Sequence, residues 1–163
     1  MSPIGVGTAI FHRTRGVGKV VDIETREWQT EETRYLVVEM MGLSYTIRIP
    51  DTSPDIRHVV SNPDGIFRTL RNEAQDLPDN YRTRQAEIRD AVDSGEPERV
   101  AAAARDLRAY AESEDGNWTT GGKRLYEHAL EMLVAEVAAS QEGNLRQARD
   151  QITAAMAKKT PSA

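Results

Sequence analysis

The sequence predicts an α+β protein, in which a small antiparallel β barrel at the N-terminus is followed by a compact all-α helical domain. Two patterns lead to this prediction. Between Val20 and Pro50, apolar and polar side chains alternate with a period of two, which is typical of half-buried antiparallel strands. After Pro50, apolar residues recur at spacings of three and four, which is typical of amphipathic helices. Short polar links containing glycine and proline separate these stretches.

Four stretches within the first fifty residues are predicted to be strands. In the third stretch, Leu36, Val38 and Met40 would face the core, while Glu39 would face solvent or a partner. The predicted strands cover residues 6–11, 19–28, 33–40 and 44–49, and a fifth short strand at residues 56–60 would complete the barrel. Strands this short are expected to form a strongly twisted barrel that buries its edges by near closure.

Five helices are predicted in the rest of the chain. They cover residues 65–72, the stretch from residue 80 to about residue 92, and residues 97–112, 120–139 and 145–157. Suitable N-caps precede several of them, because the side chains of Asn62, Asn80 (or Asp79) and Thr119 can accept a hydrogen bond from the first turn. Gly95 can occupy the position just after a helix, where a positive φ is needed.

The chain is expected to divide where the patterns change. We assign residues 1–61 to the barrel, residues 62–78 to a connection with a short helix, and residues 79–163 to the helical domain.

Composition excludes several classes of protein. The chain has no cysteine, so it has no disulfide framework, and no apolar run approaches the roughly 20 residues of a membrane span. The N-terminus lacks the features of a secretory signal, and we therefore expect a cytoplasmic protein. The net charge is −5, whereas a free-standing nucleic-acid binder usually has a basic balance. Any contact with DNA would need another partner to hold the protein there.

No pattern typical of catalysis is present, and we expect neither an enzyme nor a bound cofactor or metal ion. Gly16 and Gly18 lack the Lys-Ser/Thr pair and the helix that would follow in a phosphate-binding loop. His128 lies beside the apolar stripe of its helix, where a surface histidine is the simpler interpretation. Glu127 and Glu131 are four residues apart on a helix and are best read as a solvated face.

An ordered set of short motifs runs through the whole chain. The motifs are V-G-T-A-I-F at 6–11, G-V-G at 16–18, I-E-T-R at 23–26, T-I-R-I-P at 46–50, N-Y-R-T-R at 80–84, S-G at 94–95, R-D-L at 105–107 and K-R-L at 123–125. Each motif alone is weak. Together, and in this order, they resemble the CarD/CdnL family of bacterial transcription regulators, which bind RNA polymerase.

The resemblance implies a Tudor-like β module that binds the β subunit of RNA polymerase. Arg26 and Arg48 match the positions that serve this contact in the family. An arginine on an exposed strand can pair bidentately with a carboxylate of a partner, which suits such a role. The alternative is that both arginines are ordinary solvated residues of the sheet.

The resemblance also implies that the helical domain contacts promoter DNA at the upstream edge of the opened bubble. Tyr81 stands where the family has a tryptophan that wedges into the minor groove. An aromatic wedge of this kind holds a distorted base step open. The alternative is that Tyr81 packs over the start of its helix toward Gln85 and Ile88.

Four basic residues are candidates for DNA contact beside this tyrosine. Arg82 and Arg84 could meet phosphates. Lys123 and Arg124, near the start of a later helix, are secondary candidates, for which a solvated helix face is the simpler interpretation.

We therefore expect a monomeric transcription regulator that docks on the RNA polymerase β subunit and modulates open-complex stability. Its contact with promoter DNA would be polymerase-dependent and independent of sequence, because tethering makes a weak contact sufficient. The alternative function is a protein-interaction adaptor whose β module binds another partner and which has no role on DNA. The acidic balance and the missing tryptophan favour the adaptor.

Overall fold

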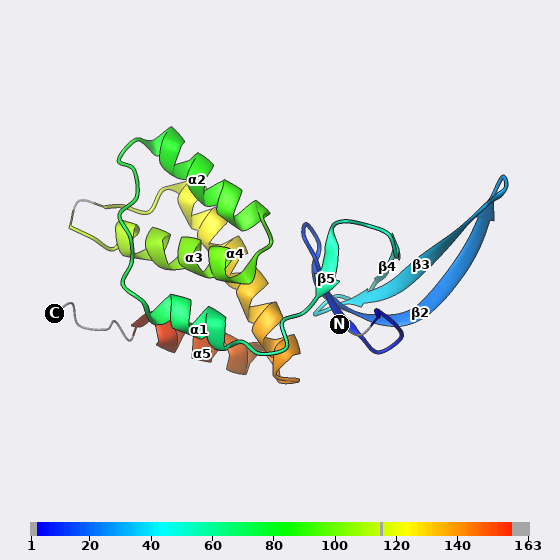
Figure 1. The fold of residues 1–163 in the computed structure, drawn as a ribbon. Coiled ribbons are helices and arrows are strands. Elements are labelled where there is room, and N and C mark those ends of the chain that lie inside the picture. The colour runs from blue at the N-terminus through cyan, green and yellow to red at the C-terminus, as the bar shows by residue number, and fades with distance from the viewer. Residues whose placement is uncertain (1–2, 115, 158–163) are drawn as a thin grey trace. The chain divides into compact units, whose positions relative to one another are not determined.

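The computed structural model describes residues 3–114 and 116–157, and it divides into two compact units, Met1–Val60 and Ser61–Ala163 (Figure 1). Within the described residues, the first unit (the β unit) holds the strands and the second (the helical unit) holds the helices. The predicted α+β fold class is confirmed. No helix in the described part of the chain is long and apolar enough to cross a membrane.

The strands form one antiparallel sheet in the order β4-β3-β2-β1-β5. They are β1 (Ala9–His12), β2 (Gly16–Trp28), β3 (Glu31–Met40), β4 (Thr46–Pro50) and β5 (Ile56–His58). The predicted closure into a barrel is wrong, because β4 and β5 end the sheet on opposite sides and do not pair with each other. With five and three residues, these strands form short edges, which limit pairing with other chains without any closure.

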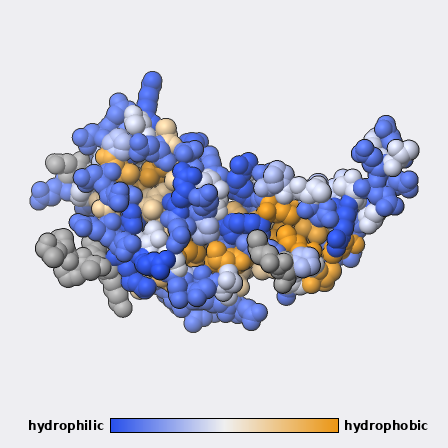
Figure 2. Space-filling view, in the orientation of Figure 1, coloured by the Kyte–Doolittle hydropathy of each residue, from blue (hydrophilic) through white to orange (hydrophobic). Residues whose placement is uncertain are grey.

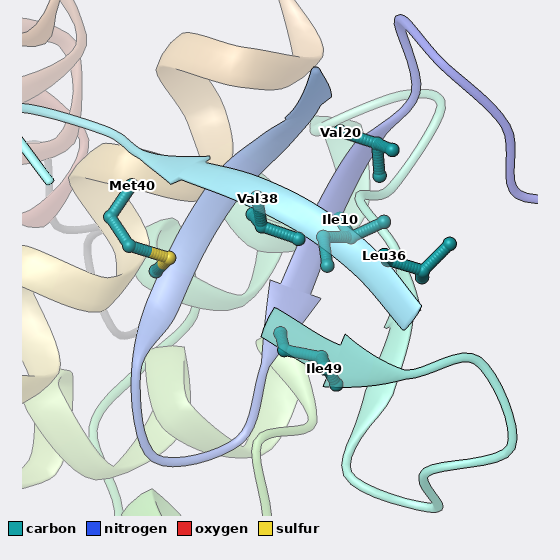
Figure 3. Close-up of a cluster of buried hydrophobic side chains, with 6 residues drawn as sticks. All are labelled: Ile10, Val20, Leu36, Val38, Met40 and Ile49. Carbon is teal, nitrogen blue, oxygen red and sulfur yellow. The ribbon is translucent and has the colours of Figure 1, made fainter. Parts of the chain in front are cut away.

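One face of the sheet carries the core of the β unit. Six buried side chains meet there, contributed by β1, β2, β3 and β4 (Figure 3): Ile10, Val20, Leu36, Val38, Met40 and Ile49. Leu36 and Val38 are completely buried and Met40 is 3% exposed, whereas Glu39 between them is exposed. Val37 is also buried, at 7% exposed, so the predicted alternation of burial holds at Glu39 and not at Val37.

β2 contains a bulge at Val21. Val20 lies opposite Val38, on the core face. Ile23 lies opposite Leu36, on the same face, although it is three positions, an odd number, further along the strand than Val20. The extra residue in β2 absorbs the odd spacing, so the strand keeps its apolar residues on the core side. The residues of β2 that consequently lie on the opposite face are Asp22, Glu24, Arg26 and Trp28.

Beyond the core, β2 and β3 continue as a two-stranded arm, residues 26–33, in which the two strands pair only with each other (Figure 1). The arm reverses at Gln29 and Thr30, and Gln29 adopts a left-handed conformation with φ of 59°. Apolar side chains gather over the base of the sheet, whereas the end of the arm is polar (Figure 2). Trp28 lies beside the reversal and is 78% exposed.

The helices are α1 (Asp64–Arg71), α2 (Tyr81–Asp93), α3 (Pro97–Ala111), α4 (Thr120–Ser140) and α5 (Leu145–Ala157). Two of the predicted N-caps are confirmed. The side-chain oxygen of Asn80 accepts a hydrogen bond from the Thr83 N–H at 3.1 Å. That of Thr119 accepts one from the Gly122 N–H at 2.9 Å. Each cap satisfies a donor that the helix itself leaves unpaired.

Two other helix boundaries follow the same chemistry. Gly95 has a φ of 67° just after α2, as predicted. α1 starts at Asp64, one residue before the predicted start at residue 65, and Pro63 occupies the N-cap position that was predicted for Asn62. The Asn62 side chain still accepts a hydrogen bond from the Asp64 N–H at 2.8 Å, so it serves the same first turn.

The helical unit is built around α3 and α4, which pack against each other. The predicted core stripe of α3 is buried: Val100, Ala103, Ala104, Leu107 and Ala111. Because most of these side chains are alanines, the neighbouring helices can approach closely. This packing fixes the starts of α2 and α4, which carry the predicted DNA-contacting residues.

Candidate functional site

A single carboxylate joins the two predicted partner-binding arginines of the β unit. The Arg48 guanidinium donates to Glu24 in a bidentate pair, with Nε–Oε2 at 2.8 Å and Nη2–Oε1 at 3.3 Å. Arg26 Nη2 lies 3.5 Å from the same Oε2 atom. The arginine side chains are 46% and 61% exposed, respectively. The cluster therefore presents two guanidinium groups and one carboxylate to solvent, with a net positive charge.

Strand register explains why these three side chains meet. Glu24 and Arg26 alternate on the same face of β2, and Arg48 lies on that face of β4, opposite Val37. The hydrogen bond from Arg48 is the main reason that the pKa of Glu24 lies below its ordinary value. Glu24 in turn raises the pKa of Arg48. Both arginines were predicted from the sequence and the carboxylate was not, although the motif I-E-T-R places Glu24 and Arg26 two residues apart.

A shallow hollow of about 310 Å³ adjoins Arg48, and Arg15 from the β1–β2 turn also lines it. His12 shapes this turn, because its Nδ1 atom accepts hydrogen bonds from the N–H groups of Thr14 and Arg15, both at 3.2 Å. The hollow places further hydrogen-bond donors next to the arginine cluster. Sequence analysis did not find Arg15, since nothing in its local pattern connects it with β4.

In the helical unit, Tyr81 is the first residue of α2 and is 46% exposed. Its hydroxyl lies against the start of α4, where a Cβ added at Gly121 would come within 2.6 Å of it. The side chain of Gln85 occupies the same place. The ring therefore packs partly toward Gln85, as the structural alternative predicted, and remains half-exposed to a partner.

Arg84 is buried, which changes its predicted role. Its side chain is 6% exposed, and Nη1 donates to the backbone carbonyls of Pro78 and Asp79, both at 3.0 Å. Its guanidinium also stacks 4.2 Å from the centre of the Tyr110 ring and 5.6 Å from that of Tyr81. Because it makes these contacts inside the unit, Arg84 is not placed to contact a phosphate. It instead packs against the ring of Tyr81.

The other basic candidates are exposed. Arg82 follows Tyr81 on α2, and Lys123 and Arg124 lie in the first turns of α4. The starts of α2 and α4 meet where Tyr81 approaches Gly121. Helix N-termini carry partial positive charge, so their convergence adds to the attraction of an anion.

The segment that leads into α2 is held by neighbouring side chains of α3. Asp106 Oδ1 accepts hydrogen bonds from the Gln75 N–H and from Arg105 Nε, both at 2.9 Å. Arg105 Nη1 also donates to the Thr69 carbonyl at 2.8 Å. The R-D-L motif thus ties the end of α1 and the following segment to α3, which fixes the position from which Tyr81 emerges.

Among the described residues, no group of three or more His, Asp or Glu side chains is arranged to hold a metal ion.

Comparison with known families gives a match over each unit. Residues 65–153 match the family model for CarD, C-terminal domain. Residues 4–60 match the model for the CarD-like/TRCF RID domain. The two matches follow each other along the chain in the same order as the two structural units, and the match to the CarD C-terminal domain alone covers more than half of the chain.

Proposed function

Because the chain belongs to the CarD/CdnL family of RNA polymerase-interacting transcription factors, we propose that its β unit docks on the β subunit of bacterial RNA polymerase. The observation that carries this proposal is the exposed cluster of Arg26, Glu24 and Arg48. Arg26 makes only one contact with the carboxylate, at 3.5 Å, and can turn its remaining donors to an acidic side chain of the polymerase. Arg48 is held in place by Glu24 and is preorganised for the same contact.

The helical unit, we further propose, contacts promoter DNA at the upstream edge of the opened bubble. The half-exposed Tyr81 ring is the wedge, and Arg82 contacts neighbouring phosphates, with Lys123 and Arg124 as secondary contacts. Arg84 holds the ring from inside the unit. By binding the opened state better than the closed one, the protein shifts the promoter equilibrium.

Tethering through the docked β unit explains how an acidic protein can bind DNA. Residues 61–163 carry 14 basic and 18 acidic residues, a net charge of −4. On its own, such a domain is repelled by the phosphate backbone. A docked β unit supplies an effective concentration of about millimolar for a short flexible link, so a weak contact is sufficient.

The docking proposal is tested by binding to an isolated N-terminal fragment of the polymerase β subunit. Arg48→Glu is expected to abolish binding, because it places a carboxylate beside Glu24 and removes the cation. Arg34→Glu is the matched control, since Arg34 is exposed on the same sheet but on the other face, paired with Asp51. Equal binding by both variants and the wild type would refute the proposed docking surface.

The wedge is tested by open-complex lifetime on a promoter. We expect Tyr81→Ala to shorten the lifetime by about 5- to 30-fold, which corresponds to about 1–2 kcal/mol of lost stacking. Tyr81→Trp should lengthen it, since a larger ring covers more of the base step. Polymerase binding should be unchanged in both variants. A lifetime that does not respond to either change contradicts the wedge role.

The acidic charge favours a second candidate, an adaptor without a role on DNA. Salt-dependent binding to forked DNA in the presence of polymerase separates the two functions, because an adaptor would show none.

A further inference from the structure

We infer that Trp28, at the end of the β2–β3 arm, is an aromatic anchor that inserts into an apolar pocket, rimmed by basic groups, on the polymerase β subunit. This inference rests on the proposed docking and extends it to a second contact region. Trp28 is the most exposed of the large apolar side chains in the described residues, at 78%. A tryptophan can bury 150–250 Å² on binding, so its exposure leaves a large contact unused.

The arm carries features that lower its own stability. Gln29 adopts a φ of 59°, a conformation that glycine or asparagine would adopt at lower cost. Glu27 lies directly opposite Glu32, and like charges in facing positions destabilise a strand pair. No third strand supports this part of the sheet. Such local conflicts are typical of segments that serve binding and not the fold.

The position of Trp28 continues the proposed docking surface. Trp28 and Arg26 lie two residues apart on the same face of β2, about 7 Å along the strand. Glu24, which joins the arginines, lies about 13 Å from Trp28 by the same measure. An interface of ordinary size covers about 800 Å² per partner and is roughly 30 Å across, so one partner can cover both.

The charges around Trp28 select the chemistry of its partner. Glu31 lies opposite Trp28 on the same face of the arm, Glu27 and Glu32 face each other on the other side, and all three are exposed. These carboxylates repel a phosphate backbone, so the partner is a protein surface and not DNA. Trp is among the residues that most often dominate binding energy when they fill a pocket. A basic group at the rim of that pocket would pair with Glu31, which lies on the same face as Trp28.

The first test measures binding of the full-length chain to the N-terminal fragment of the polymerase β subunit. Trp28→Ala is expected to weaken binding by about 30-fold or more, as for a hot-spot residue. Tyr45→Ala is the matched control, because Tyr45 is also an aromatic residue of the β unit, 47% exposed, but lies outside the arm. Its binding should equal that of the wild type. Thermal unfolding of each variant checks that the sheet is intact.

The second test uses fluorescence, since the chain has only two tryptophans, Trp28 and Trp118. In Trp118→Phe, the emission of Trp28 should shift to shorter wavelength and become protected from acrylamide when the fragment is added. Normal binding by Trp28→Ala, together with no emission shift in Trp118→Phe, overturns the inference while the docking proposal stands. A shift caused by duplex DNA and not by the fragment also overturns it. Failure of the wild-type chain to bind refutes both proposals.

Discussion

Arg84 shows how the environment of one side chain changes its function. In the sequence it is one of two arginines beside an aromatic residue, which suggested contact with phosphates. In the structure, Arg84, Ile88 and Val92 form the buried stripe of α2. A charged residue in such a stripe is not predictable from its type, because burial depends on acceptors far from the helix face. Here those acceptors are backbone carbonyls of the preceding segment.

Arg84→Ala is therefore expected to destabilise the helical unit by about 2–4 kcal/mol, since it leaves two carbonyls without a donor and two tyrosine rings without their cation. Urea unfolding measures this change. Arg84→Lys should recover only a small part of the loss, because an ammonium cannot reproduce a planar fork between two rings. Full recovery by lysine would show that charge alone matters at this position.

His12 gives a pH-dependent prediction. Burial is the main reason that its pKa lies below the ordinary value of 6.5; Arg15 and Arg13 lower it further, while Asp55 acts in the opposite direction. The folded state thus prefers the neutral ring. The stabilisation is complete above pH 6.5 and is lost as the pH falls from there through the lower pKa of the folded state.

His12→Asn tests this dependence. Asparagine offers an acceptor for the N–H groups of Thr14 and Arg15 but does not titrate. Between pH 7.5 and 5.5, the wild type should lose more of its free energy of unfolding than the variant does. Parallel pH profiles for the two proteins would rule out protonation of His12 as a cause.

At the scale of elements, the features that depend only on nearby residues could be predicted from the sequence. Asn80 and Thr119 cap their helices because capping needs only residues within one turn. The sides of β3 followed from alternation. Closure of the sheet depends on whether β4 and β5, which are distant from each other in the sheet, pair. The lengths of these two short strands do not predict whether they pair. The Glu24 cluster joins residues 24 positions apart, so only the register could bring it together.

The meeting of α2 and α4 makes Gly121 a spacing element for Tyr81. Gly121→Ala places a methyl group within 2.6 Å of the present position of the Tyr81 hydroxyl, and the ring must turn away. The fold should tolerate this, because alanine favours the helix by about 0.5–1 kcal/mol over glycine. We expect near-wild-type unfolding and polymerase binding, with a shortened open-complex lifetime.

Gly143→Ala is the control for this change. Its added methyl group would make only an ordinary contact, 3.5 Å from Gln147. If both variants leave the lifetime unchanged, the position of the Tyr81 ring against α4 has no influence on DNA.

At the scale of the whole molecule, the two units divide the proposed work. The fragment of residues 1–60 should bind the polymerase β fragment within about threefold of the full chain, because the proposed contacts all lie in that unit. Residues 61–163 alone should leave open-complex lifetime unchanged at concentrations where the full chain acts. Binding assays and promoter assays with separate fragments check this. Activity of the second fragment by itself would mean that tethering is not required.

The bulge at Val21 determines how the protein would respond to the loss of a single codon. Because Val21 is the one residue between Gly18 and Trp28 without a counterpart in β3, losing its codon leaves every later side chain on its present face. Losing the codon for Thr25 instead would transpose Arg26 and Trp28 to the other side of the sheet. Single-codon deletions along β2 are therefore unequal: one leaves the docking surface intact, and the other divides it, because Arg26 and Trp28 change face while Glu24 and Arg48 keep theirs.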